Sequence, residues 1–157
     1  MTRRAVALPP IEALVPHRDA MLWLTRLVTA ENDAVEAEAI VPYDAWYLDE
    51  DGGMPGWLGI ELMAQALSAH VGLRGWLAGE PPKPGVLLGC RAYRACAACY
   101  PAGTALSVKA SVVYRDESGF GAYDCTISAG GRELASATLK VYEPTDFAAF
   151  LHEKSVP

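Results

Sequence analysis

One carboxylate lies in the most apolar stretch of the chain. Residues 54–65 read Met-Pro-Gly-Trp-Leu-Gly-Ile-Glu-Leu-Met-Ala-Gln, and Glu61 is the only charged residue among them. Burial of an ionised carboxylate is costly, so a core helix normally excludes one unless it is paired or has a function. If burial raises its pKa, Glu61 could donate a proton to a leaving group; alternatively, it hydrogen-bonds backbone amides across a subunit interface. Gln65 lies four residues later, on the same helix face.

A long helix is expected to position Glu61. Pro55 suits the first helical turn, where the missing N–H of proline costs nothing. Apolar residues continue on nearly all sides to about Leu77, which indicates a helix that is buried over most of its surface. His70 is expected on the exposed side of this helix. The glycine- and proline-rich run 79–85 cannot be helical and forms the following loop.

Strands are expected on both sides of this helix. Residues 34–41 alternate apolar and acidic side chains, which is the period of a half-exposed strand, and Gly130-Gly131 indicates a hairpin turn. The predicted strands are 22–31, 34–41, 86–93 with a continuation at 96–100, 105–115, 120–129 and 132–142, with short helices at 11–14 and 146–154. This order predicts an α+β fold, an antiparallel sheet wrapped around one long central helix, in a single domain of residues 1–157.

The composition narrows the class of protein. The chain has 157 residues, 52% of them hydrophobic, and a net charge of −6. The negative charge argues against nucleic acid or an anionic membrane as the main partner, because both require basic surfaces. Without a recognisable signal peptide or membrane span, we expect a cytoplasmic protein. We expect no cofactor and no metal, since Cys96-Ala-Ala-Cys99 lacks a second ligand pair at zinc-site spacing and no phosphate-binding glycine loop is present.

Several motifs occur in the order seen in one enzyme family. They are Leu-Val-Pro-His-Arg at 14–18, Met-Leu-Trp-Leu-Thr-Arg-Leu-Val at 21–28, the helix opening at 55–65, Leu-Gly-Cys-Arg-Ala-Tyr-Arg at 88–94 and Pro-Ala-Gly at 101–103. Together they resemble the hotdog-fold family of 3-hydroxyacyl-acyl-carrier-protein dehydratases, over roughly residues 12–143. The resemblance is greatest to the dehydratase-like subgroup associated with aryl polyene and related lipid biosynthesis. It implies a hotdog fold and a dehydratase, a lyase acting on acyl thioesters.

The chain departs from the family at the catalytic histidine. In the family this histidine precedes the helix acid by fourteen residues, which is the position of Tyr47 here, and the loop 46–53 contains no histidine. Similar subgroup members share this feature. An unperturbed tyrosine has a pKa of about 10 and is a poor base, so Tyr47 is expected to pack or to donate its hydroxyl hydrogen. His17 could be the base if its segment folds near Glu61; alternatively, it only positions that segment.

Removal of water from a 3-hydroxyacyl thioester makes three chemical demands. A base takes the proton beside the carbonyl, an acid protonates the leaving hydroxyl, and a donor stabilises the charge on the thioester oxygen. Glu61 is the expected acid, and the resemblance assigns the donor to the N–H of Gly56 at the helix start. An apolar tunnel beside the helix would hold the acyl chain, with Trp57 in its lining. Tyr47 and Gln65 complete the expected substrate-binding residues.

The resemblance also implies partners. In the family the site lies at a dimer interface, with the histidine from one subunit and the acid from the other. We therefore expect a thioester of acyl carrier protein or coenzyme A as substrate, and a homodimer or a heterodimer with a histidine-bearing hotdog paralogue. The alternatives are a thioesterase in which Glu61 activates water or attacks the thioester, and a non-catalytic acyl-binding subunit. Arg74, Lys83, Arg91 and Arg94 either form a docking surface for an acidic carrier protein or are ordinary surface charge.

Overall fold

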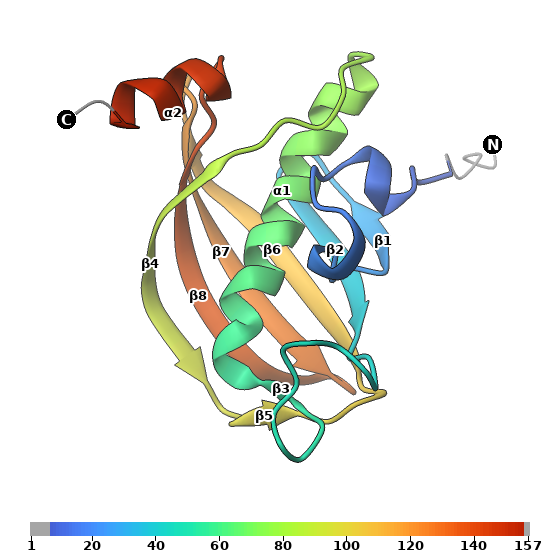
Figure 1. The fold of residues 1–157 in the computed structure, drawn as a ribbon. Coiled ribbons are helices and arrows are strands. Elements are labelled where there is room, and N and C mark those ends of the chain that lie inside the picture. Colours follow the sequence, from blue (N-terminus) through green and yellow to red (C-terminus); the bar gives the residue numbers. More distant parts are fainter. Residues whose placement is uncertain (1–6, 156–157) are drawn as a thin grey trace, which may run out of the picture.

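A six-stranded antiparallel sheet curves around one long helix (Figure 1). This computed structural model describes residues 7–155. The strands run in the order β1-β2-β6-β7-β8-β4. Their bounds are β1 Arg26–Ala30, β2 Ala34–Ile40, β4 Val86–Ala95, β6 Ala105–Arg115, β7 Phe120–Ala129 and β8 Arg132–Tyr142. The predicted α+β arrangement, an antiparallel sheet wrapped around a central helix, is therefore confirmed.

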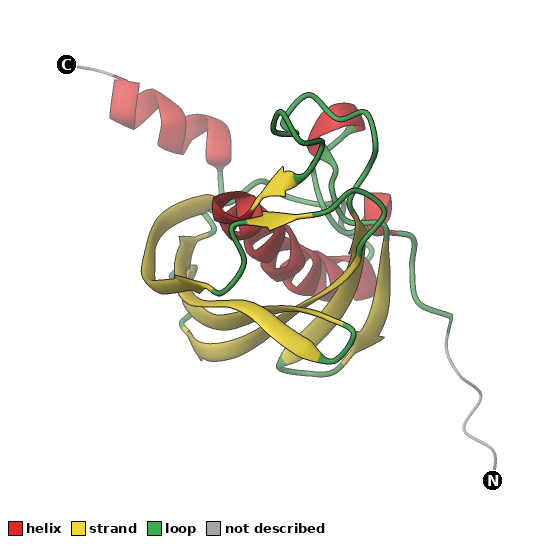
Figure 2. Ribbon diagram, turned by 90° about the horizontal axis from the view of Figure 1, so that it is seen from below, coloured by secondary structure: helices red, strands yellow, loops and turns green. Residues whose placement is uncertain are grey.

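The central helix α1 (Gly59–Leu77) lies in the hollow of the sheet, where it contacts β2, β6 and β7 (Figure 2). A shorter helix, α2 (Phe147–Ser155), lies outside the sheet and buries none of its residues. The core between α1 and the sheet contains Leu62, Ala66 and Val108, each fully buried. Among residues 7–155, no helix is both long and apolar enough to cross a membrane.

The alternation predicted for the strands is present in the sheet. In β2, Val35, Ala37 and Ala39 are buried against α1, whereas Glu36 and Glu38 point away from the core. These inward side chains supply the apolar contact that holds the sheet around the helix. Gly130 and Gly131 both have positive φ, at 56° and 78°, as the tight turn between β7 and β8 requires. The first strand is shorter than predicted, since the residues from 22 to 25 precede β1.

The start of the helix differs from the expectation. Pro55 lies in a short strand, β3 (Met54–Pro55), and a 3-10 turn, η3 (Gly56–Leu58), separates it from α1. β3 pairs with β5 (Cys99–Tyr100), which was expected to continue the preceding strand but forms this separate ladder. The pairing keeps the chain extended through Pro55, so the helix begins later than the position of the proline suggested.

Two short 3-10 turns pack the N-terminal segment against α1. They are η1 (Ile11–Ala13) and η2 (Asp19–Met21). Gly72 of α1 makes the approach possible, because a Cβ at this position would lie 1.7 Å from the carbonyl oxygen of Leu14. The absence of a side chain lets the backbone of one element touch the other. The segment between η1 and η2, which carries His17, is thereby held beside the first half of α1.

His70 is buried, and its expected position on the exposed side of α1 is wrong. The residue is 1% exposed, its Nε2 lies 2.9 Å from the carbonyl oxygen of Asn32, and its Nδ1 lies 3.1 Å from the hydroxyl of Tyr123. The apolar residues next to His70 in the sequence do not reveal these partners, because Asn32 and Tyr123 are distant from His70 in the chain. Burial lowers the pKa of His70 below its usual value of 6.5, so the folded protein holds it neutral.

We expect the free energy of unfolding to fall as the pH drops below about 6.5, because the unfolded chain binds a proton that folded His70 does not. The stabilisation is complete above the unfolded pKa and is lost as the pH falls towards the folded one. The slope reaches at most about 1.4 kcal/mol per pH unit. Chemical denaturation of the wild type and of His70→Gln at several pH values measures it. His152→Gln, in exposed α2, is the matched control and should keep the wild-type slope; an unchanged slope in His70→Gln would contradict the prediction.

Candidate active site

His17 and Glu61 form a pair at the start of α1. The Nε2 of His17 lies 3.4 Å from Oε1 of Glu61, with the two side chains 26% and 33% exposed. Glu61 belongs to the first turn of α1, and His17 comes from the segment that Gly72 admits against the helix. His17 could act as a base only if its segment folds near Glu61, and the segment does lie there. The pair can hold one proton between an imidazole and a carboxylate.

Gln65 holds the Glu61 carboxylate of this pair and the backbone of the N-terminal segment. Its amide nitrogen donates to Oε1 of Glu61 at 2.9 Å and to the carbonyl oxygen of Met21 at 2.8 Å. Its amide oxygen accepts from the backbone N–H of Trp23 at 2.9 Å. The side chain is fully buried and its hydrogen-bonding groups are engaged within the protein. Gln65 thus clamps the N-terminal segment to α1 and orients the carboxylate, one turn of helix away.

We expect Gln65→Leu to lower the free energy of unfolding by about 2–3 kcal/mol, because the buried N–H of Trp23 and the carbonyl of Met21 lose their partner. Urea denaturation measures the loss. Arg74→Leu places the same side chain on the exposed side of α1 and should change stability by less than about 0.5 kcal/mol. Equal effects of the two substitutions would argue against the clamp.

The pKa of Glu61 is lowered, so the condition under which Glu61 alone would donate a proton, a pKa raised by burial, is not met. Burial acts to raise it, but hydrogen bonds with His17 and Gln65 and the electrostatic effect of His17 outweigh that effect. Glu61 is therefore ionised at neutral pH. A proton for a leaving group then comes from the His17–Glu61 pair as a unit, since an ionised carboxylate alone has none to give.

The N–H of Gly56 is occupied within the protomer. It donates to the carbonyl oxygen of Ala98 at 2.8 Å, and the hydroxyl of Tyr93 donates to the carbonyl oxygen of Gly56. A Cβ at Gly56 would lie 2.3 Å from the oxygen of Ala97, so the backbone packs closely there. The next amides, those of Trp57 and Leu58, lie in the first turn, where helices leave N–H groups without intrahelical partners. They replace Gly56 as the candidate donors to a thioester oxygen.

Tyr47 and Trp57 lie apart from the cavity beside α1. The ring of Tyr47 packs on Trp23, with centroids 4.4 Å apart, and burial raises its pKa, which makes it a still poorer base. Trp57 is 67% exposed on η3. A large indole left in solvent four residues before Glu61 offers contact area to another chain.

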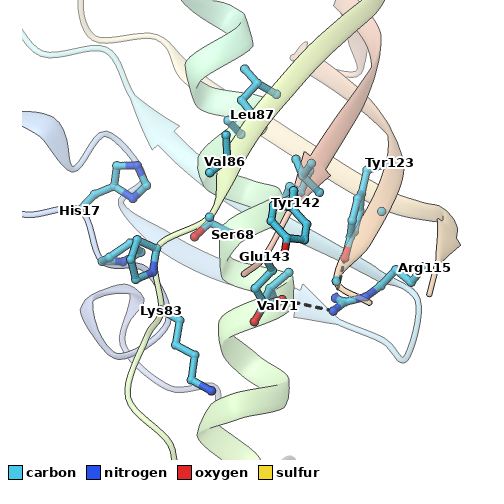
Figure 3. A pocket seen from close by; sticks show the side chains of 18 of the residues that line it. His17, Ser68, Val71, Lys83, Val86, Leu87, Arg115, Tyr123, Tyr142 and Glu143 are labelled. Atoms are coloured by element: carbon cyan, nitrogen blue, oxygen red, sulfur yellow. Dashed lines mark hydrogen bonds and ion pairs between the residues drawn. The ribbon is translucent and has the colours of Figure 1, made fainter. Parts of the chain in front are cut away.

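A cavity of about 250 Å³ runs along α1 from the paired residues (Figure 3). Its walls come from one face of α1, from the start of β4 and from parts of β6, β7 and β8, and they are mostly apolar. His17 lies on one side of the cavity, and Arg115 with Tyr123 lies on the opposite side. The residues that line it between these ends include Ala64, Leu67, Ser68, Val71, Val86 and Leu87. This is the apolar tunnel beside the helix that the sequence predicted, although Trp57 is not part of its lining.

The polar residues at the far end were not identified from the sequence. Arg115, Tyr123 and Glu143 come from β6, β7 and the chain just after β8, and only the register of the sheet brings them together. A second cavity of about 290 Å³ shares Lys83, Arg115 and Glu143 with the first and is also lined by Arg74. The four basic residues considered as one docking surface therefore lie in two places. Arg74 and Lys83 lie beside the second cavity, whereas Arg91 and Arg94 lie on exposed β4.

All four thiols are free, and Cys96 and Cys99 lie on either side of the turn into β5. Among residues 7–155, the structure contains no group of three or more histidine, cysteine or acidic side chains placed to hold a metal ion.

Several proteins of known structure resemble this chain. The chain is similar to the dehydratase heterocomplex ApeI:P from Xenorhabdus doucetiae, at 27% identity and a TM-score of 0.88, over 96% of this chain and 100% of that chain. The PaaI protein of the E. coli phenylacetic acid degradation operon is 16% identical, with a TM-score of 0.59 over 74% of this chain and 81% of that one. Thioesterase superfamily member 2 from Mus musculus is 14% identical, with a TM-score of 0.55 over 74% and 79%. The last two likenesses concern the fold alone.

These likenesses agree with the hotdog fold expected from the sequence. None of the curated proteins matches the chain. A family model described as ApeP-like, ApeP dehydratase, matches residues 9–152, which is most of the sequence and includes the paired residues His17 and Glu61. The chain belongs to the ApeP-like dehydratase family.

Proposed function

We propose that this protein is a subunit of a 3-hydroxyacyl thioester dehydratase and contributes the pair formed by His17 and Glu61 to a shared active site. The observation that carries the proposal is this pair, 3.4 Å apart, at one end of an apolar cavity in a member of a dehydratase family. The reaction converts a 3-hydroxyacyl thioester into a 2-enoyl thioester and water. The cavity holds the acyl chain and brings the 3-hydroxyl group to the pair.

In the proposed reaction each group has one task. A base removes a proton from C2, the C3–O bond breaks, and the proton held between His17 and Glu61 passes to the departing hydroxyl to give water. The N–H groups of Trp57 and Leu58 stabilise the charge that develops on the thioester oxygen. Tyr47 is a poor candidate for the base that removes the proton from C2, because burial raises its pKa further.

We propose that the base comes from a histidine-bearing hotdog partner in a heterodimer. One support is the similar ApeI:P protein, which is a heterocomplex. Another is the surface next to Glu61, where Trp57 is 67% exposed, together with the edge strand β4, whose Leu87 and Leu88 are 43% and 51% exposed. An edge strand with apolar side chains is a natural site for pairing with another chain. A homodimer remains the alternative arrangement.

The acyl group would arrive as a thioester of an acyl carrier protein or of coenzyme A, in a fatty-acid or aryl-polyene type of lipid synthesis. Carrier proteins are acidic, so docking on a chain of net charge −6 requires a local basic surface. Arg91 and Arg94 on exposed β4 are the candidates, because Arg74 and Lys83 lie beside the second cavity, next to Arg115 and away from Glu61.

Product analysis by mass spectrometry tests the proposal. The purified chain, alone and mixed with a histidine-bearing hotdog paralogue, is given a 3-hydroxyacyl carrier thioester. Loss of water only in the mixture supports the shared site, and loss of water by the chain alone would mean that His17 itself serves as the base. Absence of dehydration in every mixture, despite formation of a complex, would overturn the proposal.

A thioesterase is the second candidate, and the lowered pKa of Glu61 is the observation that favours it. An ionised carboxylate can activate water or attack a thioester carbonyl without a histidine base. The same mass spectrometry separates the two reactions, because hydrolysis releases a free acid and a thiol. A third possibility, a non-catalytic acyl-binding subunit, predicts that Glu61→Gln leaves the activity of the partner unchanged.

A further inference from the structure

The far end of the cavity contains a polar cluster that the proposed reaction does not use. We infer that Arg115 and Glu143 bind a hydroxyl group at the end of the acyl chain remote from the thioester, an inference that rests on the proposed function. The cluster lies opposite His17 across the cavity (Figure 3). The chemistry that it would select is an acyl chain that ends in a hydroxyl instead of a methyl group.

The length and lining of the cavity fit a chain held between two polar ends. Along α1, the residues that line it run from Glu61 to Val71, which at the helical rise corresponds to about 15 Å. The side chains between the ends are mostly apolar, as an acyl chain requires. A substrate whose 3-hydroxyl group lies at Glu61 therefore extends its far end towards Arg115.

Hydrogen bonds hold Arg115 in a fixed position. Neutral His70 donates from Nε2 to the carbonyl oxygen of Asn32 at 2.9 Å, which leaves its Nδ1 to accept from the hydroxyl of Tyr123 at 3.1 Å. The hydroxyl oxygen of Tyr123 in turn accepts from a guanidinium nitrogen of Arg115 at 3.0 Å. Tyr123 is fully buried, so this chain of bonds anchors the arginine to the core. Such preorganisation makes a binding group selective.

The ion pair between Arg115 and Glu143 determines which kind of chain end the cluster can bind. Its guanidinium lies 3.4 Å from a carboxylate oxygen of Glu143, and the side chains of the two are 23% and 27% exposed. The charges of Arg115 and Glu143 cancel, and Lys83, which also lines the cavity, is paired with Glu80 at 3.0 Å, so an anionic chain end would gain little net attraction. A hydroxyl group can accept a hydrogen bond from the guanidinium and donate one to the carboxylate at the same time. A methyl end would remove water from both charged groups and return no hydrogen bond.

Binding measurements separate this inference from the reaction. The probes are amide-linked 3-hydroxyacyl pantetheines, which neither hydrolyse nor need a catalyst to bind, in pairs of equal heavy-atom count ending in a methyl or a hydroxyl group. Titration calorimetry with the full chain, alone and in complex with a partner, should show about tenfold tighter binding of the hydroxyl-ended probe, as expected for one additional hydrogen bond to a charged group. The ratio of the two affinities is the quantity compared between variants.

In Arg115→Met the affinity ratio should fall to near one, whereas Arg132→Met, the same change at an exposed hairpin position, should keep the wild-type ratio. If Arg115→Met fails to fold, as circular dichroism would show, Glu143→Gln is the second variant. It keeps an acceptor oxygen but loses the charge, so the ratio should also fall.

Three results would overturn the inference. They are equal affinities of the two probes for the wild type, tighter binding of a probe that ends in a carboxylate, and a loss of affinity for phosphopantetheine without an acyl chain in Arg115→Met, which would assign this end to the carrier arm. Equal affinities together with dehydration would leave the proposed function intact. A tenfold preference without dehydration would support the binding of the hydroxyl end and contradict the dehydratase.

Discussion

Replacement of Glu61 by glutamine is expected to lower the rate of dehydration of a 3-hydroxyacyl thioester by about 10²–10⁴-fold, the usual contribution of a general acid or base. Glutamine keeps the size of the side chain and can still hydrogen-bond Gln65, but it cannot share a proton with His17. The leaving hydroxyl then departs without protonation. Formation of the 2-enoyl product, followed by mass spectrometry in the complex with a histidine-bearing partner, gives the rate.

The control for this experiment is Glu133→Gln, the same change at an exposed position of the hairpin between β7 and β8, which should leave the rate unchanged. Thermal melting of both variants tests whether the fold is retained. A Glu61→Gln protein that is folded, binds its partner and dehydrates at the wild-type rate would assign this chain a non-catalytic role. Loss of hydrolysis instead of dehydration would favour the thioesterase.

The arrangement of the fold could be predicted from the sequence because its signals are local. The alternation in β2 and the glycine pair Gly130-Gly131 report the conformation of their own residues, and both are as predicted. The nearly all-apolar α1 requires surroundings on most sides, and only a sheet that curves around it provides them. The predictions that failed concern contacts between segments that are distant in the sequence. His70 looks like a surface histidine in its own helix, and only contacts with Asn32 and Tyr123 show otherwise.

In the candidate site, too, a feature that depends on adjacent residues could be recognised in the sequence, whereas features that depend on distant segments could not. Glu61 was identifiable because one charge in an apolar helix is itself the signal, but the direction of its pKa shift depends on His17, 44 positions earlier in the chain. The role assigned to the N–H of Gly56 depended on its being free, and the pairing of β3 with β5 gives that N–H to Ala98. Contacts between separate segments thus decide the protonation state of the acid and which amides are available.

The close contact between Gly72 and Leu14 helps to place the segment that carries His17 beside Glu61, and Gly72→Ala should disrupt it. A Cβ would lie 1.7 Å from the carbonyl oxygen of Leu14, and backbone atoms at such a distance must move apart. We expect a loss of about 3 kcal/mol in the free energy of unfolding, as for an overpacked core. Because the displaced segment carries His17, the dehydration rate should fall as well.

Gly75→Ala is a matched control for this prediction, since the same substitution falls one turn further along α1. There the nearest atom to an added Cβ is 3.7 Å away, an ordinary contact distance. The greater helix propensity of alanine should then raise the free energy of unfolding by up to about 1 kcal/mol. Urea denaturation of both variants therefore gives changes of opposite sign if Gly72 is needed for the approach of the N-terminal segment. A Gly72→Ala protein as stable and active as Gly75→Ala would show that the place of His17 beside Glu61 does not depend on the contact at Gly72.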